Sequence, residues 1–175
     1  MKLNSLFGKP IEIKENEFAE AVKKVLLDIK NVDIPKDIQN NPLKSIDFIS
    51  LIMQGYKSML EDNFISGRTL RGILRNTCKV SLYQYNLFTN MGMKKVYSYI
   101  KEVLEHKNKD YGNSALKNGG LVGNYVRMSD KISRIENLQK KENPNFESLQ
   151  DTWLDLAGYA ILGLVILSYC QEELN

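Results

Sequence analysis

The sequence has few of the residues that build disulfide scaffolds and thiolate metal sites. It contains only two cysteines in 175 residues, Cys78 and Cys170, and they lie far apart without Cys or His neighbours at metal-ligand spacing. This pattern indicates neither a disulfide framework nor a thiolate zinc site. Two isolated thiols are typical of buried residues in a reducing compartment, so we expect a cytoplasmic protein.

The chain also lacks the pattern of a secretion signal and a long apolar run. No basic segment followed by an apolar one opens it, so secretion is not expected. Its longest apolar run, Leu156 to Leu167, is shorter than the roughly 20 residues that cross a bilayer and contains two glycines. We therefore interpret this run as a buried core helix and expect no membrane partner.

Prolines and excess charge are scarce as well. Four prolines stand among many Leu, Ile and Lys residues, which predicts a mostly helical chain. Lys and Arg number 24 against 21 Asp and Glu, and the net charge of +3 permits an anionic ligand without requiring one. The length fits one domain, or a core domain with an appendage.

Helical periodicity predicts an all-α helical bundle. Apolar residues recur every three or four positions in segments that Pro, Gly or Asn separate. The expected helices run through 18–29, 46–60, about 69–80, 96–111, from 121 onward, and from about 145 toward 170. We divide the chain into an N-terminal helical region of unassigned role, 1–90, and a motif-bearing region, 91–175, which together could form one compact domain.

A cationic stripe lies on the third expected helix. Arg68, Arg71, Arg75 and Lys79 follow one another at helical spacing, beside the apolar side of the helix. Such a stripe could contact phosphates, from nucleic acid or from a nucleotide. The alternative is an ordinary solvated helix face.

Charged residues continue the apolar stripe of the fourth expected helix. The stripe runs from Val96 to Val103, and a rotation of about 100° per residue places Lys107 and Asp110 on the same side. The same rotation per residue places Glu102 and Glu105 away from that side. We therefore interpret this pair of glutamates as solvated.

A polar, cationic edge borders the apolar stripe of the next helix. The stripe runs from Tyr125 to Ile135, and the edge consists of Asn124, Arg127, Lys131 and Arg134. Arg and Lys donate hydrogen bonds with matching charge to phosphate oxygens, and Asn can pair with a base or sugar edge. Because Asp130 lies four positions before Arg134, ordinary intrahelical pairing is the alternative.

One acid stands in the most apolar helix of the chain. Asp155 lies among apolar residues from Trp153 onward, and Asp151 precedes it by one turn on the same face. A buried carboxylate needs a cation, a metal or hydrogen bonds to offset its desolvation. The two acids could hold a divalent cation together, or Asp155 could pair with Lys107, Lys131 or Arg134.

Three sequence blocks, "KNKDYG", "NYVRMSDKISRIENL" and "DTWLDLAGYAILG", together resemble the phage and bacterial nucleotide-modification-associated domain family. That family is similar to the all-α MazG-type nucleoside triphosphate pyrophosphohydrolases. The resemblance covers roughly Val96 to Tyr169, in the order and spacing of the blocks. It implies a bundle with MazG-like C-terminal motif helices and additional N-terminal helices.

The resemblance also implies roles for individual residues. Mg²⁺ (or Mn²⁺) would be the cofactor, Asp151 and Asp155 would be catalytic and would bind the metal, and Asp110 could be a third ligand. The substrate-binding residues would be Lys107, Tyr111, Asn124, Arg127, Lys131 and Arg134. MazG-type sites add glutamates from an early helix, where this chain has only Glu102 and Glu105.

The leading hypothesis is a Mg²⁺-dependent pyrophosphohydrolase that cleaves a (deoxy)nucleoside triphosphate to the monophosphate and pyrophosphate, in nucleotide-pool or phage nucleotide-modification metabolism. Its partners would be a nucleotide ligand and further copies of the chain, as a dimer or tetramer. An alternative is a phage protein that sequesters a nucleotide or nucleotide signal without catalysis. A third hypothesis is a nucleic-acid-binding protein that uses the basic helix of residues 68–79.

Overall fold

The computed structural model describes residues 13–111, 119–141 and 146–172, and all regular elements in these ranges are helices, with no strand among them. They are α1 (Glu15–Lys30), α2 (Lys36–Gln39), α3 (Pro42–Glu61), α4 (Gly67–Thr89), α5 (Met93–Tyr111), α7 (Gly120–Gln139) and α8 (Phe146–Glu172). The all-α prediction is confirmed.

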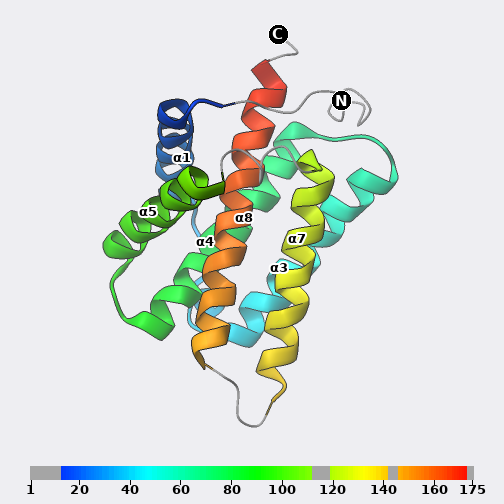
Figure 1. Cartoon of the computed structure of the whole chain (residues 1–175). Coiled ribbons are helices and arrows are strands. Elements are labelled where there is room, and N and C mark those ends of the chain that lie inside the picture. The colour runs from blue at the N-terminus through cyan, green and yellow to red at the C-terminus, as the bar shows by residue number, and fades with distance from the viewer. Residues whose placement is uncertain (1–12, 112–118, 142–145, 173–175) are drawn as a thin grey trace.

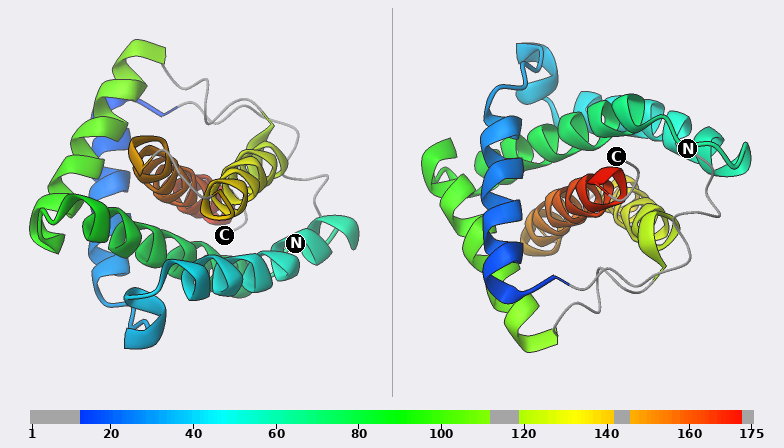
Figure 2. Two further views of the ribbon diagram at one scale, coloured as in Figure 1. Left: turned by 90° about the horizontal axis from the view of Figure 1, so that it is seen from below. Right: turned by 90° about the horizontal axis from the view of Figure 1, so that it is seen from above.

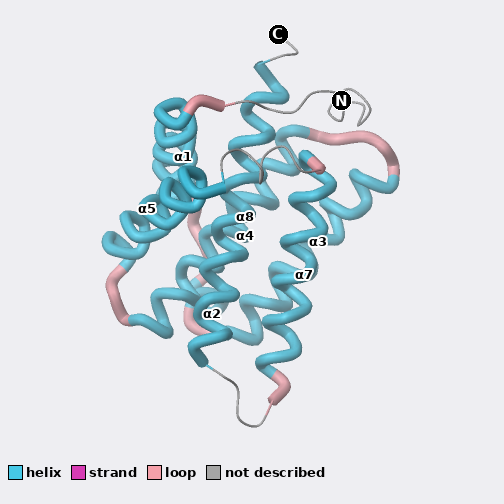
Figure 3. The backbone as a smooth tube through the Cα atoms, in the orientation of Figure 1, coloured by secondary structure: helices cyan, strands magenta, loops and turns pink. Residues whose placement is uncertain are grey.

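Helix α8 lies in the middle of the bundle (Figure 1). Its most extensive contacts are with α4 and α7. Seen from either end, α7 and α8 have the row of α3 and α4 along one side and the pair of α1 and α5 along another (Figure 2). One hydrophobic core joins residues of the N-terminal helices and of α8. The boundary that we placed near residue 90 falls in the short loop between α4 and α5 (Figure 3).

Local sequence explains where the helices begin and end. Asn41 caps α3, because its Oδ1 accepts hydrogen bonds from the backbone N–H groups of Leu43 and Lys44, at 3.0 and 3.1 Å. Ser66 caps α4 in the same way through Thr69. Asn90, with a φ of 50°, ends α4 in the left-handed conformation that Asn tolerates.

Two details differ from the helices that periodicity predicted. Helix α4 continues to Thr89 rather than ending near Val80, because Leu82 and Tyr85 extend its buried face. The polar connection before Pro42 contains the short helix α2. Four residues are too few to show a helical period, so periodicity could not predict this helix.

Helix α8 supplies much of the core. Trp153 is among its fully buried side chains, and the apolar run that follows is buried almost throughout. Residues 148–170 are long and apolar enough to cross a membrane, and 78% of the most apolar window is buried inside the bundle. Such burial is typical of a core helix, as we expected for this run.

Gly163 lets α7 and α4 approach α8 closely. A Cβ added at this residue would lie 2.6 Å from Oδ1 of Asn124 and 3.1 Å from both δ-carbons of Leu74. We expect Gly163→Ala to destabilise the protein by roughly 1–3 kcal/mol, because overpacking forces neighbours apart. Urea unfolding followed by circular dichroism measures this change.

Gly72 provides the matched control for that substitution. It also lies inside a long helix, but a Cβ there would meet nothing within 4 Å. Gly72→Ala should be neutral or stabilising by up to about 1 kcal/mol, because alanine favours the helix. Equal losses of stability in the two variants would contradict the close-packing account.

Candidate functional site

Helices α7 and α8 are neighbours of opposite direction (Figure 1). Polar contacts join them along their shared edge. Moving along α7, each turn offers one polar or cationic residue to α8. These residues are Asn124, Arg127, Lys131 and Arg134. The structure therefore brings together the whole edge that helical spacing indicated, and we call these four residues the α7 edge.

Asp155 of α8 is the point where three helices meet. Its Oδ2 accepts a hydrogen bond from Nζ of Lys131 on α7, at 2.8 Å, and its Oδ1 accepts one from Nζ of Lys107 on α5, at 3.2 Å. The side chain of Asp155 is 32% exposed, so it lies at the rim of the core rather than within it. The predicted pairing of Asp155 with Lys107 and Lys131 is therefore present, and the divalent-cation site stays a prediction.

The lysines set the protonation of Asp155. Burial alone would raise the pKa of its carboxyl group. The hydrogen bond from Lys131 and the positive charges of Lys107 and Lys131 together outweigh burial, so the pKa lies below the usual aspartate value. Asp155 is therefore a carboxylate near neutral pH, and the cluster of Asp155, Lys107 and Lys131 carries a net positive charge.

The lowered pKa predicts a dependence of stability on pH. A carboxyl group whose folded-state pKa is depressed stabilises the fold above its unfolded pKa, and this stabilisation is lost as the pH falls through the folded pKa. Between pH 7 and about pH 3, the stability advantage of the wild type over Asp155→Asn should therefore shrink. Urea midpoints at a series of pH values measure it. Parallel curves of stability against pH for the two proteins would contradict the lowered pKa of Asp155. The control variant is Asp47→Asn, because Asp47 lies on the exposed side of α3.

Asn124 has a different environment from the other α7 edge residues. It is buried, and its Nδ2 donates a hydrogen bond to the backbone oxygen of Tyr159 at 2.7 Å. Its Oδ1 lies against Gly163 and has no hydrogen-bond partner among the described residues. This geometry makes Asn124 a connection between α7 and α8, while its predicted pairing with a base or sugar stays a prediction.

The two arginines of the α7 edge lie on either side of the Asp155 cluster. The guanidinium of Arg127 lies over the ring of Tyr159, 5.9 Å from its centroid. Nη2 of Arg134 donates a hydrogen bond to Oγ of Ser148 at 2.6 Å. Both arginines are exposed, so they remain accessible to an anion. The predicted intrahelical pair of Arg134 with Asp130 is not among the contacts of this arginine that the structure describes.

A hollow of about 570 Å³ opens beside Arg134. It lies where α7 ends and α8 begins, and its lining includes the cations Arg134 and Lys141, the hydroxyl groups of Ser133 and Ser148, and the carboxyl group of Asp130. Cations and hydroxyl groups both suit an anionic ligand. The hollow therefore continues the positive region of the α7 edge.

The predicted metal ligands are only partly within the described structure. Asp151 is exposed and lies one turn before Asp155 on α8. Helix α5 extends through Asp110 and Tyr111, but the structure does not describe these two side chains. Among the described residues, no group of three or more His, Cys, Asp or Glu side chains could hold a metal ion.

The prediction of which face of α5 is buried was partly wrong. Leu104, rather than Val103, continues the buried stripe of Val96 and Ile100. Lys107 is therefore mostly exposed, and its long side chain reaches inward to Asp155. Glu105 is partly buried and pairs with Lys101 at 2.8 Å on the same helix.

The cationic stripe on α4 is largely engaged within the protein. Nε of Arg75 pairs with Asp28 at 3.1 Å, and Lys79 is buried, with its Nζ 2.9 Å from the backbone oxygen of Lys30. Burial lowers the pKa of Lys79. Arg75 and Lys79 are thus less available to a nucleic acid than the sequence alone indicated.

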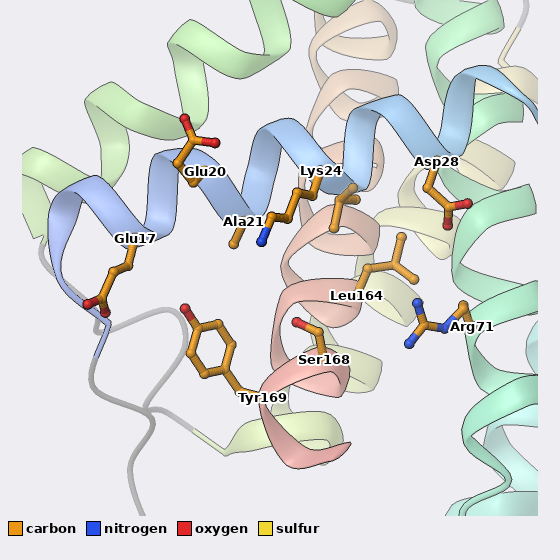
Figure 4. A pocket seen from close by; sticks show the side chains of 10 residues that line it. Glu17, Glu20, Ala21, Lys24, Asp28, Arg71, Leu164, Ser168 and Tyr169 are labelled. Atoms are coloured by element: carbon orange, nitrogen blue, oxygen red, sulfur yellow. The ribbon is translucent and has the colours of Figure 1, made fainter. Parts of the chain in front are cut away.

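Arg71 lines a second hollow, of about 420 Å³, between α1, α4 and α8. Figure 4 shows Arg71 at one side of this hollow and Tyr169 at the other, with Lys24 and Ser168 between them. Three acids of α1 also line this hollow: Glu17, Glu20 and Asp28. Their charges oppose those of Lys24 and Arg71, so this hollow favours an anion less than the α7 edge does.

Sequence reasoning missed two residues of the α7–α8 edge. Tyr159 and Ser148 contact Arg127 and Arg134, but neither carries a charge that would have drawn notice. A signal was present for Tyr159, because it follows Asp155 by one turn and thus shares its face.

Comparison with known proteins bears on this edge. The chain has no significant match among curated proteins or solved structures. Residues 107–167 match the family described as "Nucleotide modification associated domain 1". The matched segment contains Lys107, Lys131, Asp155 and the whole α7 edge. Over these residues the chain is therefore similar to a nucleotide-modification-associated domain, and that part of the sequence-based resemblance is confirmed.

Proposed function

We propose that the chain binds a (deoxy)nucleoside triphosphate along the α7–α8 edge and hydrolyses it, with Mg²⁺ or Mn²⁺, to the monophosphate and pyrophosphate. The observation that supports this most directly is the meeting of Lys107 and Lys131 on Asp155, inside the segment that matches a nucleotide-modification-associated domain. The relation to MazG-type enzymes, a phage setting and a homo-oligomeric state are parts of the same proposal.

The two lysines are well suited to exchange partners. In the structure they pair with Asp155, and a triphosphate would offer them oxygens of higher charge. Lys107 is 57% exposed and can swing toward a ligand, whereas Lys131 is 23% exposed and is held more firmly by its surroundings. Phosphate binding would thus release one or both oxygens of Asp155.

The carboxylate released in this way, together with Asp151, would fit a magnesium ion in its usual protein environment. Mg²⁺ is commonly bound by one or two carboxylates together with substrate phosphates. Asp155 and the exposed Asp151, one turn apart on α8, supply such a pair, and Asp110 is positioned near the end of α5. When bound there, the ion would supply Lewis-acid stabilisation of charge on the reacting phosphoryl group.

Residues of the chain would bind and orient the phosphates and position the attacking water. Lys107 and Lys131 would hold phosphate oxygens and reduce the repulsion that an incoming nucleophile meets. Arg134 would orient the far end of the triphosphate from its place beside Ser148. With phosphates fixed in this way, Asp151 or Asp155 could accept a hydrogen bond from the attacking water.

Product analysis tests the proposal. The purified chain is incubated with each dNTP and NTP plus Mg²⁺ or Mn²⁺, and nucleotides and pyrophosphate are separated by chromatography. We expect one or more substrates to yield the monophosphate and pyrophosphate in equal amounts. Intact nucleotides throughout the panel, from a chain shown to be folded, would refute the hydrolase.

A second candidate function is nucleotide sequestration without catalysis. It is favoured because both oxygens of Asp155 accept hydrogen bonds from lysines and because the described residues offer no cluster of three metal-ligating side chains. A sequestering protein would bind a triphosphate tightly without divalent metal and release no product. The same panel, repeated as a binding assay in EDTA, separates the two candidates.

A further inference from the structure

We infer that the nucleotide lies along the α7–α8 edge in one direction, with its base against Tyr159 and Arg127 and its terminal phosphate toward Arg134 and Lys141. This inference rests on the proposed function and deepens it by assigning a base subsite. It follows from the order of chemical groups along the edge.

The end of the edge at Arg127 and Tyr159 suits a base better than a phosphate. Tyr159 provides the aromatic ring, and the planar guanidinium of Arg127 lies over it at 5.9 Å. A nucleobase can stack on an aromatic ring or on a guanidinium plane, and such stacking tolerates different bases. Beyond this pair the edge closes, because Asn124 is buried against Gly163.

The opposite end of the edge, at Arg134, suits the phosphates. The hollow of about 570 Å³ there places Arg134 and Lys141 near the hydroxyl groups of Ser133 and Ser148, and Asp130 is the one acid among the described residues that line it. Lys107 and Lys131 lie between the two ends, on Asp155. Most of the cationic side chains along the edge therefore lie at or beyond Lys131, on the side of Arg134, where a triphosphate tail would need them.

The spacing agrees with this order. From Arg127 to Arg134 the helix α7 rises by roughly 10 Å, about two turns. An extended nucleoside triphosphate can cover such a span from its base to its terminal phosphate. The middle phosphates would then meet Lys131 and Lys107, where the proposed reaction takes place.

Calorimetric titration of the full chain tests the direction. The probes are the four dNTPs with a non-hydrolysable α–β linkage and inorganic tripolyphosphate, each with Mg²⁺. Tyr159→Leu keeps apolar bulk but removes the stacking face, so the nucleotide analogues should bind roughly 5- to 150-fold more weakly. Tripolyphosphate should bind as it does to the wild type, and Tyr159→Phe should bind both as the wild type does.

Two further variants complete the design. Arg134→Gln should weaken tripolyphosphate and nucleotide alike. Tyr83→Leu is the matched control, because Tyr83 also carries a cation over its ring, Lys79 at 5.5 Å, but lies on α4 outside the edge. It should bind every probe as the wild type does.

The outcomes distinguish failure of the inferred nucleotide direction from failure of the proposed function. If the wild type binds nucleotides and Tyr159→Leu weakens nucleotide and tripolyphosphate equally, or weakens neither, the direction is wrong while the function stands. If the wild type binds neither probe, both the function and the direction are wrong. Loss of nucleotide affinity alone supports the base subsite.

Discussion

Asp155→Asn is expected to abolish pyrophosphate release from every nucleoside triphosphate that the wild type cleaves, while the protein stays folded. The amide keeps the shape of the side chain but removes the charge that pairs with Lys107 and Lys131 and that would bind the metal. Hydrolysis would thus lose a metal ligand and the partner that positions both lysines. Chromatographic product analysis and circular dichroism together measure the two halves of the expectation.

Asp47→Asn is the control for that experiment. Asp47 is exposed on α3 and lies outside the α7–α8 edge, so this substitution removes the same charge without touching the cluster. Turnover should match that of the wild type. Wild-type turnover by Asp155→Asn would refute the catalytic assignment of Asp155, because a metal-binding carboxylate cannot be replaced by an amide without loss.

Lys131→Met should weaken nucleotide triphosphate binding by roughly 10- to 150-fold, because a hydrogen bond to a charged group contributes about 1.5–3 kcal/mol. Lys131 is the closer and less exposed partner of Asp155, at 2.8 Å, so its loss should cost more affinity than the loss of Lys107. Methionine keeps most of the apolar stem. Calorimetry with a non-hydrolysable dNTP compares the two lysine variants.

Lys57→Met controls for the loss of a positive charge elsewhere. Lys57 pairs with Glu61 on the exposed surface of α3, with 60% of its side chain exposed. The affinity of the Lys57→Met variant for the nucleotide should equal that of the wild type. If Lys131→Met binds as tightly as Lys57→Met, then Lys131 serves only the ion pair with Asp155 and the proposed phosphate contact is wrong.

The fold was predictable from sequence because its helices are strongly periodic. The six long helices within the described residues were expected, and the core helix was recognised from the apolar run after Trp153. The end of α4 was placed too early, since the packing that buries Leu82 and Tyr85 depends on helices distant in the sequence. Periodicity gives the face of a helix but does not say which neighbour covers it.

The candidate site was predictable only in part, for a related reason. The wheel of α7 placed Asn124, Arg127, Lys131 and Arg134 on one edge, and the structure agrees. It could not show that Lys107, 48 residues before Asp155, meets the same carboxylate as Lys131, because that depends on how α5 crosses α8. For the same reason the contacts of Arg75 and Lys79 with the end of α1 were missed.

The central claim is that nucleotide phosphates bind the two lysines, Lys107 and Lys131, that pair with Asp155. Its most direct test is NMR of the lysine side chains in ¹³C-labelled protein, titrated with a non-hydrolysable dNTP and Mg²⁺. We expect the Cε–Hε signals of Lys107 and Lys131 to shift together with nucleotide concentration, while that of Lys57 stays fixed. Saturable binding that leaves both signals unchanged, or that shifts Lys24 beside the α1–α8 hollow instead, would contradict the claim.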